Sequence, residues 1–247
     1  MKRNILFLFL FGLSLQAFSQ NEFYSLSTYT LKFGSSANAL HQYLEEALIP
    51  ALNRQGVQNI GAFEEQGQSL PGKVYLFVPY ASMSQYEQVQ NALKKDSQFA
   101  AAAEKYHSLD YGKTPYASLT VAFFTAFDGH PKLTKPRKDA ELFELRTYQS
   151  GIEEAAIRKV KMFNEGELDI FNDTGLYSVF FGSRIAGPQM PSLTYMLGFK
   201  DMAERDANWD KFVKSPAWKS LSGEEEYANL LINIDRVFLK RLAYSEL

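Results

Sequence analysis

The sequence predicts an α+β protein built from two tandem copies of one unit, each with the order strand, helix, strand, strand, helix, strand. Three observations predict this class. Similar segments recur in the same order along the two halves, hydrophobic residues alternate in the segments expected to be strands, and they recur at helical spacing between those segments. A large core is possible, because 46% of the 247 residues are hydrophobic and 15% are aromatic.

Residues 1–19 are typical of a secretory signal peptide. Lys2 and Arg3 precede a nearly unbroken apolar run from Ile5 to Leu15, and the small residues at positions 17 and 19 suit cleavage before Gln20. The alternative is a membrane anchor, but the run is shorter than the roughly 20 residues that span a bilayer. We therefore expect an exported protein, periplasmic or secreted, with no membrane span after the signal peptide is removed.

The first copy is expected at residues 20–127 and the second at residues 142–247. The segment FYSLSTYTL, which begins at Phe23, corresponds to LFELRTYQS, and each is followed by an amphipathic helix. A glycine then follows in each copy, Gly56 or Gly175, where the end of a helix favours a left-handed residue. Each copy ends in an apolar strand, SLTVAFFTAF or LINIDRVFL.

Two further correspondences fall late in each copy. KVYLFVPYASM corresponds to LTYMLGFKDMA, which sets Tyr75 against Tyr195, and LKKDSQF corresponds to FVKSPAW, which sets Phe99 against Trp218. Between the copies, residues 128–141 contain two prolines, a glycine and four basic residues. This composition predicts a linker, whose basic cluster we interpret as solvated rather than as a binding patch.

The first helix of each copy has an irregular feature. In copy one, Pro50 lies inside an apolar helical pattern that runs from Leu40 to Leu52 and should kink it or end its regular part. In copy two, Asn164 and Glu167 interrupt the apolar pattern; they could reach a pocket, but we favour a solvated edge for both.

Both tryptophans lie in NWDKFVKSPAW, residues 208–218. Ser215 is a suitable N-cap and Pro216 a suitable first helical residue, so one helix should end near Val213 and another begin at SPAW. Trp218 then corresponds to a core aromatic of copy one. Trp209 corresponds only to Gln90 and is the better candidate for a role specific to copy two.

The segments FELRTYQ, YMLGFKDMAERDANW and SPAW together resemble the NIPSNAP family. Copy one is a degenerate version, with SLSTY in place of ELRTY and DSQF in place of SPAW. The resemblance implies a ferredoxin-like fold of the dimeric α/β-barrel superfamily. Two copies in one chain would then pair as an intramolecular barrel, which leaves a monomer with an internal pseudo-dimer or a homodimer open.

Alternation along the strand FELRTY separates Phe143, Leu145 and Thr147 from Glu144, Arg146 and Tyr148. We expect the first three side chains to pack on the helices and the second three to face the barrel interior. Copy one offers only Ser25, Ser27 and Tyr29 at the matching places, so the two halves are predicted to be chemically unequal.

Asp235, on the last strand, is expected to meet Glu144 and Arg146 inside the barrel. The cluster has two interpretations: a structural network, in which buried charges persist because they are paired, or a site that orients a polar group of a ligand. Tyr195 and Trp209 complete the set of candidate binding residues, and no catalytic residue is assigned.

Composition and motifs exclude several functions. Removing Lys2 and Arg3 from the 26 basic residues leaves 24 against 28 acidic residues, a formal charge of −4, which does not favour nucleic acid. Without cysteine there is no disulfide, thiolate nucleophile or Cys-ligated metal. The three histidines lack metal-ligand spacing, and no Walker, dinucleotide or nucleophile-elbow motif is present. We therefore expect neither a metal nor a cofactor.

Three functions stay open. The favoured one is an exported protein that binds a small, partly aromatic or anionic molecule in the C-terminal half of the barrel. The second is a cofactor-independent monooxygenase or isomerase, suggested by enzymes of similar fold, in which Tyr148 or Glu144 handles a proton and Arg146 holds an anion. The third is an interaction module with a solid core.

Overall fold

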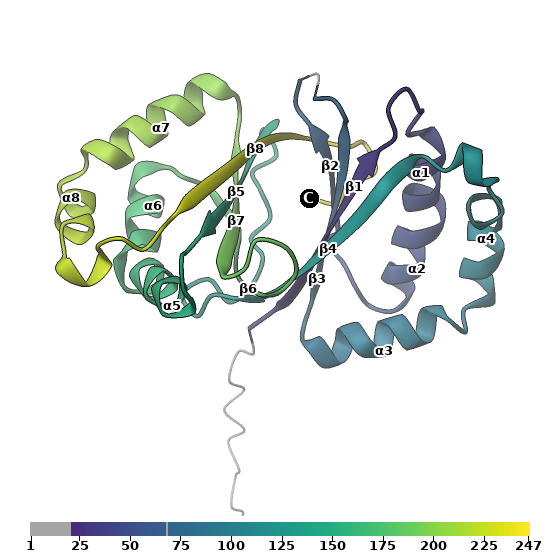
Figure 1. The fold of residues 1–247 in the computed structure, drawn as a ribbon, viewed down its shortest axis with the longest axis horizontal. Coiled ribbons are helices and arrows are strands. Elements are labelled where there is room, and N and C mark those ends of the chain that lie inside the picture. Colours follow the sequence, from purple (N-terminus) through teal and green to yellow (C-terminus); the bar gives the residue numbers. More distant parts are fainter. Residues whose placement is uncertain (1–20, 68) are drawn as a thin grey trace, which may run out of the picture.

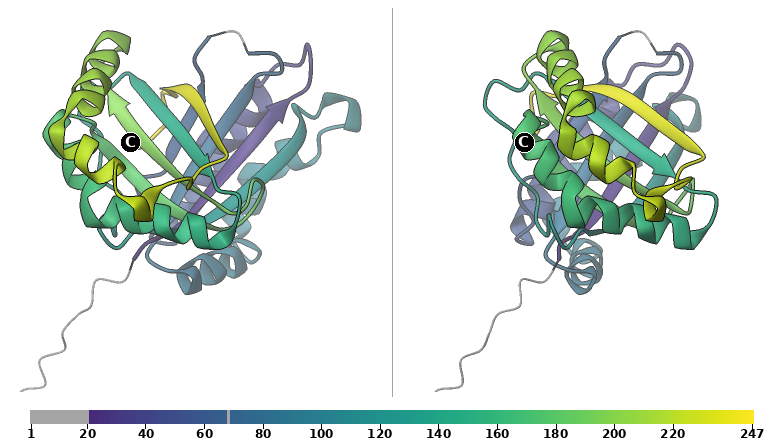
Figure 2. Two further views of the ribbon diagram at one scale, coloured as in Figure 1. Left: turned by 60° about the vertical axis from the view of Figure 1, so that its left-hand side comes forward. Right: turned by 90° about the vertical axis from the view of Figure 1, so that its left-hand side faces the viewer.

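The computed structural model describes residues 21–67 and 69–247, and in this part of the chain eight antiparallel strands form a closed barrel (Figure 1). The helices lie outside the barrel in two groups, α1–α4 against the first half and α5–α8 against the second (Figures 1 and 2). The predicted signal peptide lies outside the described residues. No helix in the described ranges is long and apolar enough to cross a bilayer.

Each half has the predicted element order. The first contains β1 (Phe23–Leu31), α1 (Asn38–Tyr43), a π-helical turn (Leu44–Leu48), α2 (Ile49–Arg54), β2 (Gly61–Glu65), β3 (Lys73–Tyr80), α3 (Met83–Leu93), α4 (Ser97–His107) and β4 (Tyr116–Ala126). The second contains β5 (Leu142–Gln149), α5 (Glu153–Met162), a π-helical turn (Phe163–Glu167), α6 (Leu168–Thr174), β6 (Ser178–Ala186), β7 (Ser192–Phe199), α7 (Met202–Lys214), α8 (Pro216–Ser222) and β8 (Asn233–Arg241).

Four pairs of elements, from β1 to α8, repeat at a spacing of 119 residues. The pairs β1 and β5, β3 and β7, α3 and α7, and α4 and α8 begin at residues 23 and 142, 73 and 192, 83 and 202, and 97 and 216. The predicted match of Tyr75 with Tyr195 spans 120 residues and is wrong by one position. The counterpart of Tyr75 is Thr194, because Tyr75 pairs with Thr28 on β1 as Thr194 pairs with Thr147 on β5.

The two halves close one barrel, in the strand order β1-β3-β2-β8-β5-β7-β6-β4. Each half supplies a four-stranded sheet, β4-β1-β3-β2 or β8-β5-β7-β6, and the sheets join at the β2–β8 and β4–β6 seams. Closure leaves none of these strands with an unpaired edge. The prediction of two ferredoxin-like repeats that pair as an intramolecular α/β barrel is confirmed.

Aromatic side chains fill much of the barrel interior. Phe77 stacks on Phe180 with ring centroids 4.3 Å apart, and Phe63 meets Phe143 at 5.0 Å. The segment between the halves contributes to this core, because Leu133 and Ala140 pack against it. The interior is therefore apolar where the rings meet.

Local signals placed several helix ends correctly. Ser215 caps α8, since its hydroxyl accepts a hydrogen bond of 3.0 Å from the backbone N–H of Trp218, and Pro216 is the first residue of that helix. Gly175 ends α6 with φ at +77°, and Gly56 has φ at +80°. The irregularity expected near Pro50 is the π-helical turn before α2. Because the second half has the same turn without a proline, Pro50 is not its general cause.

Candidate functional site

The two faces of β5 are reversed relative to the prediction. Phe143 and Leu145 belong to the core of the barrel interior, whereas Tyr148 packs with residues of α6 and α7 on the helix side. Glu144 has no exposed surface and lies on the same face as Tyr148. Both faces of this strand are buried. Alternation therefore predicted which side chains share a face, but not which face points into the barrel.

Asp235 does not join the predicted cluster. It is opposite Thr147 in the β5–β8 register, so its side chain lies on the barrel-interior face of the sheet. Its carboxylate accepts hydrogen bonds from Asn233, at 3.0 Å, and from Gln189. The predicted meeting of Asp235 with Glu144 and Arg146 is therefore wrong.

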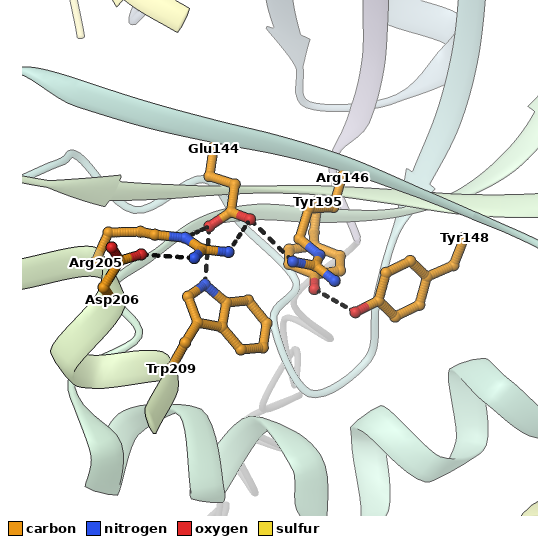
Figure 3. Close-up of polar contacts among 7 residues, drawn as sticks. All are labelled: Glu144, Arg146, Tyr148, Tyr195, Arg205, Asp206 and Trp209. Atoms are coloured by element: carbon orange, nitrogen blue, oxygen red, sulfur yellow. Dashed lines mark hydrogen bonds and ion pairs between the residues drawn. The ribbon is translucent and has the colours of Figure 1, made fainter. Parts of the chain in front are cut away.

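Glu144 is the centre of a polar network between β5 and α7 (Figure 3). One oxygen accepts from Arg146 Nη1 at 2.9 Å and Arg205 Nη2 at 3.0 Å; the other accepts from Arg205 Nε at 3.0 Å and Trp209 Nε1 at 2.8 Å. Burial by itself would raise the pKa of Glu144. The hydrogen bond from Arg205 and the charge of Arg146 outweigh burial, and the pKa lies below its usual value.

Sequence reasoning named Trp209 and missed Arg205. The two residues are four positions apart on α7, so they lie on one face of the helix and reach the same carboxylate (Figure 3). This spacing was the available signal. Arg205 also bonds Asp206 at 2.8 Å, which places a second acidic residue beside the network.

Tyr148 and Tyr195 form a buried pair next to Arg146. The Tyr195 hydroxyl donates to the Tyr148 hydroxyl at 2.8 Å, and the two rings meet edge to face at 5.3 Å. Burial raises the pKa of both phenols, so both stay protonated near neutral pH. The Arg146 guanidinium lies 4.5 Å from the centroid of the Trp209 ring and 5.3 Å from that of Tyr148.

A second charged pair, Lys159 with Glu167, is buried beside the tyrosines. Lys159 Nζ lies 2.6 Å from Glu167 Oε2, and the residues are 4% and 2% exposed. The ammonium group also lies over the rings of Phe163 and Trp218, 4.6 and 5.6 Å from their centroids. Burial raises the pKa of Glu167, against the opposing charge of Lys159.

The prediction that Glu167 lies on a solvated edge is therefore wrong. The π-helical turn from Phe163 to Glu167 explains the error, since one extra residue in a turn shifts the helix phase by about 100°. Asn164, the other residue expected there, accepts a hydrogen bond of 2.9 Å from the backbone N–H of Gly129.

A pocket of about 270 Å³ opens between these side chains, and both tryptophans line it. Val213 and Ile234, which are 51% and 45% exposed, are its most exposed lining residues. The complete lining comprises Arg146, Tyr148, Lys159, Glu167, Trp209, Phe212, Val213, Trp218, Leu231 and Ile234. Of the predicted candidates, Arg146, Tyr148 and Trp209 line the pocket, Glu144 and Tyr195 support them, and Asp235 lies elsewhere.

The pocket combines aromatic surface with hydrogen-bonding capacity. Arg146 Nε is buried and has no hydrogen-bond partner among the described residues. The arrangement can hold a ring against the indoles and a negatively charged group against the guanidinium. Within residues 21–67 and 69–247, no group of three His, Asp or Glu side chains comes together as a metal site.

The first half lacks this chemistry. At the spacing of 119 residues, Ser25 and Ser27 occupy the positions of Glu144 and Arg146. Leu40 and Leu48 occupy the positions of Lys159 and Glu167. Leu40 is fully buried in the first-half core. The two halves share one fold and are chemically unequal.

Comparison with known structures supports the same fold. A proposed monooxygenase of Lactobacillus acidophilus NCFM is 12% identical, with a TM-score of 0.59 over 90% of this chain and 94% of that chain. A proposed monooxygenase of Fusobacterium nucleatum subsp. nucleatum is 11% identical, with a TM-score of 0.56 over 90% and 93%. An anthrone oxidase-like protein is 8% identical, with a TM-score of 0.50 over 90% and 92%.

No protein of the curated set matches the sequence significantly. The sequence profile of the NIPSNAP family matches twice, at residues 24–111 and 143–246. The two segments lie in the two halves of the barrel, the first ending before β4, and together they cover most of the chain, so the protein belongs to the NIPSNAP family.

Proposed function

We propose that the pocket of the second half binds a small organic molecule that carries an aromatic ring and a negatively charged group. The observation that supports this most directly is Arg146. Its guanidinium lines the pocket, is fixed at one end by Glu144, and keeps a buried Nε without a partner among the described residues.

Charge in the pocket favours an anionic ligand. Arg146, Lys159 and Glu167 are its charged lining residues, which gives one positive charge in excess. Behind the lining, Arg205 binds Glu144 through two nitrogens and also pairs with Asp206, so the excess positive charge belongs to the lining residues themselves. A carboxylate or phenolate would restore the balance through charge-assisted hydrogen bonds.

Shape and lining favour an aromatic ring. The indoles of Trp209 and Trp218 and the ring of Phe212 line the pocket, and a volume of about 270 Å³ is close to the lower end for small-molecule sites. A flat ring would contact these side chains without displacing a polar group.

Tryptophan fluorescence tests the proposal, because both tryptophans of the chain line the pocket. We expect 2-naphthoate to change the fluorescence saturably, and neutral 2-naphthamide to bind about tenfold more weakly. Arg146→Gln should weaken 2-naphthoate by a similar factor. The matched control is Arg54→Gln, which removes an arginine that pairs with Asp96 far from the pocket. Equal affinity for the acid and the amide, or an unaffected Arg146→Gln variant, would contradict the proposal.

The natural ligand class can be found by mass spectrometry of the protein purified from its own source. Spectra recorded under native and then denaturing conditions should show the loss of a small aromatic acid from the protein.

We also propose export, since residues 1–19 have the pattern of a signal peptide. N-terminal sequencing of the mature protein should begin at or near Gln20, and an N-terminus at Met1 would contradict export by this route.

A second candidate function is oxidation of an aromatic substrate without a cofactor. It is supported by the fold shared with the proposed monooxygenases and the anthrone oxidase-like protein and by Glu167. This carboxylate lines the pocket and has a raised pKa, whereas the lowered pKa of Glu144 makes that residue a poor base. Glu167 would then accept the substrate proton and Arg146 would stabilise the resulting anion.

Anthrone is a suitable probe for this second function. One oxygen atom of O₂ would enter the methylene carbon and the other would leave as water, with anthrone as the only electron donor. Oxygen uptake above the uncatalysed rate, lost in Glu167→Gln, would support it. No oxygen uptake above the uncatalysed rate would leave binding as the function of the pocket.

The third alternative, an interaction module with a solid core, requires the absence of ligand-sized space, and the pocket argues against it.

A further inference from the structure

The barrel has a second cavity on the other side of β5. It has a volume of about 440 Å³ and is lined by interior-facing residues of both halves, among them Thr28, Leu26, Leu145 and Thr147. Leu145 and Thr147 alternate along the strand with Arg146 and Tyr148, which line the pocket described above. One strand therefore separates the two spaces.

Arg184 of β6 lines this cavity and is 8% exposed. Its Nη2 donates to the Thr194 hydroxyl at 3.0 Å and its Nη1 donates to the Pro188 carbonyl. Its Nε is buried without a hydrogen-bond partner in the described part of the chain, and the bonds of its other two nitrogens go to neutral oxygens. Burial lowers the pKa of Arg184 to about 10, opposed only by the charge of Asp235, so the guanidinium stays protonated at neutral pH.

The first half shows how the fold satisfies a charge at this place. The counterpart of Arg184, 119 residues earlier, is Glu65, whose carboxylate accepts from Lys73 Nζ at 3.0 Å and the Tyr75 hydroxyl at 2.7 Å. The counterparts of Lys73 and Tyr75 are Ser192 and Thr194. The first half therefore contains a complete ion pair at this position.

Within the described ranges, the second half contains the charge without a direct ion pair. Asp235, which lines the same cavity and whose charge acts on Arg184, accepts its hydrogen bonds from Asn233 and Gln189 instead. Thr194 supplies one neutral acceptor to Arg184, and the buried Ser192 hydroxyl has no partner among the described residues. A buried cation is costly unless an anion pairs with it. The missing hydrogen-bonded counter-ion thus distinguishes this position in the second half from its counterpart in the first.

We infer that the cavity is a second binding site, in which Arg184 holds the carboxylate of a small organic acid. The acid should have a short aliphatic body, because Leu26, Ala122 and Leu145 form an apolar part of the lining. Hydroxyl groups such as those of Thr28 and Thr147 offer further hydrogen bonds near the carboxylate. This site is independent of the tryptophan-lined pocket.

Calorimetric titration of the full mature chain with sodium hexanoate tests the inference, with neutral hexanamide as the matched ligand. We expect hexanoate to bind and hexanamide to bind about tenfold more weakly or not at all. Arg184→Gln should weaken hexanoate about tenfold, and Arg146→Gln, which alters the other pocket, should change it by less than about twofold. No binding of hexanoate, or equal binding by Arg184→Gln, would overturn the inference.

A second variant keeps the test decisive if Arg184→Gln does not fold. The β6–β7 register places Leu193 opposite Ser183, so the next pair sets Ser192 beside Arg184. Ser192→Asp should therefore supply an internal counter-ion from the position that Lys73 occupies in the first half, and hexanoate should bind about tenfold more weakly. Undiminished affinity in folded Ser192→Asp would overturn the inference. Since tryptophan fluorescence reports the other pocket, failure of either site is recognised separately.

Discussion

The buried pair Lys159 and Glu167 gives the sharpest test of how the two halves relate. Their counterparts in the first half are Leu40 and Leu48, so the chain itself provides an apolar solution for the same place in the fold. We predict that Lys159→Leu and Glu167→Leu each destabilise the protein strongly. The double variant should be about as stable as the wild type or more stable.

The magnitudes follow from burial. Either single change leaves one charge buried, at 2% or 4% exposure, without its partner 2.6 Å away. Losing one partner of a buried pair costs about 3–5 kcal/mol, whereas replacing both by apolar residues is often neutral or stabilising by about 1–4 kcal/mol. For a domain of this size, 1 kcal/mol corresponds to a change of about 2–4 °C in Tm. The single variants should therefore melt about 6–20 °C lower.

The loss in Lys159→Leu should depend on pH. Burial raises the pKa of Glu167 above its usual value of 4.5, so the folded state binds this proton more tightly than the unfolded state. The contribution of Glu167 to stability is then greatest below pH 4.5 and declines as pH rises through the folded pKa. Removing Lys159 raises that pKa further, so the destabilisation should be smaller at pH 5 than at pH 8.

Thermal unfolding followed by circular dichroism, with urea titrations at both pH values, measures these effects. A double variant as unstable as the single variants would refute the reasoning, because it would mean that the second half cannot accept the packing of the first. Single variants within about 1 kcal/mol of the wild type would refute the assigned cost of the unpaired charge.

Three further predictions concern separate parts of the fold. The pKa of Glu144 is lowered from 4.5, so its contribution to stability is present above pH 4.5 and is lost as the pH falls through the pKa of the folded state. The urea midpoint of Glu144→Gln should therefore fall less between pH 5 and pH 3 than that of the wild type. Ser215→Ala removes the N-cap of α8 and should cost about 1 kcal/mol, measured as a urea midpoint; an unchanged midpoint would mean that the cap contributes nothing. Gly182→Ala would bring a new Cβ within 2.7 Å of Phe124 Cβ at the β4–β6 seam and should cost about 1–3 kcal/mol by overpacking, whereas a Tm equal to that of the wild type would show that the seam adjusts freely.

Most residues of the candidate site could be predicted from the sequence, but most of the contacts between them could not. Glu144, Arg146, Tyr148, Tyr195 and Trp209 do come together (Figure 3). Arg205 was missed because its role depends on the packing of α7 against β5. Glu167 was named but placed on a solvated edge, because the π-helical turn changes which side of the helix it occupies, and its partner Lys159 was missed with it. Asp235 was placed with the cluster on alternation alone, and the register with Thr147 puts it on the other face.

The sequence by itself determined the repeat, its element order and several helix ends. These features depend on short-range chemistry: a serine before a proline, glycines at helix ends, and hydrophobic residues at the period of a helix or strand. Only the tertiary structure decided which face of β5 looks into the barrel, because a strand buried on both sides carries no exposed face to orient it. It also decided the match of Tyr75 with Thr194, since a slip of one residue along a strand moves a side chain from one face to the other.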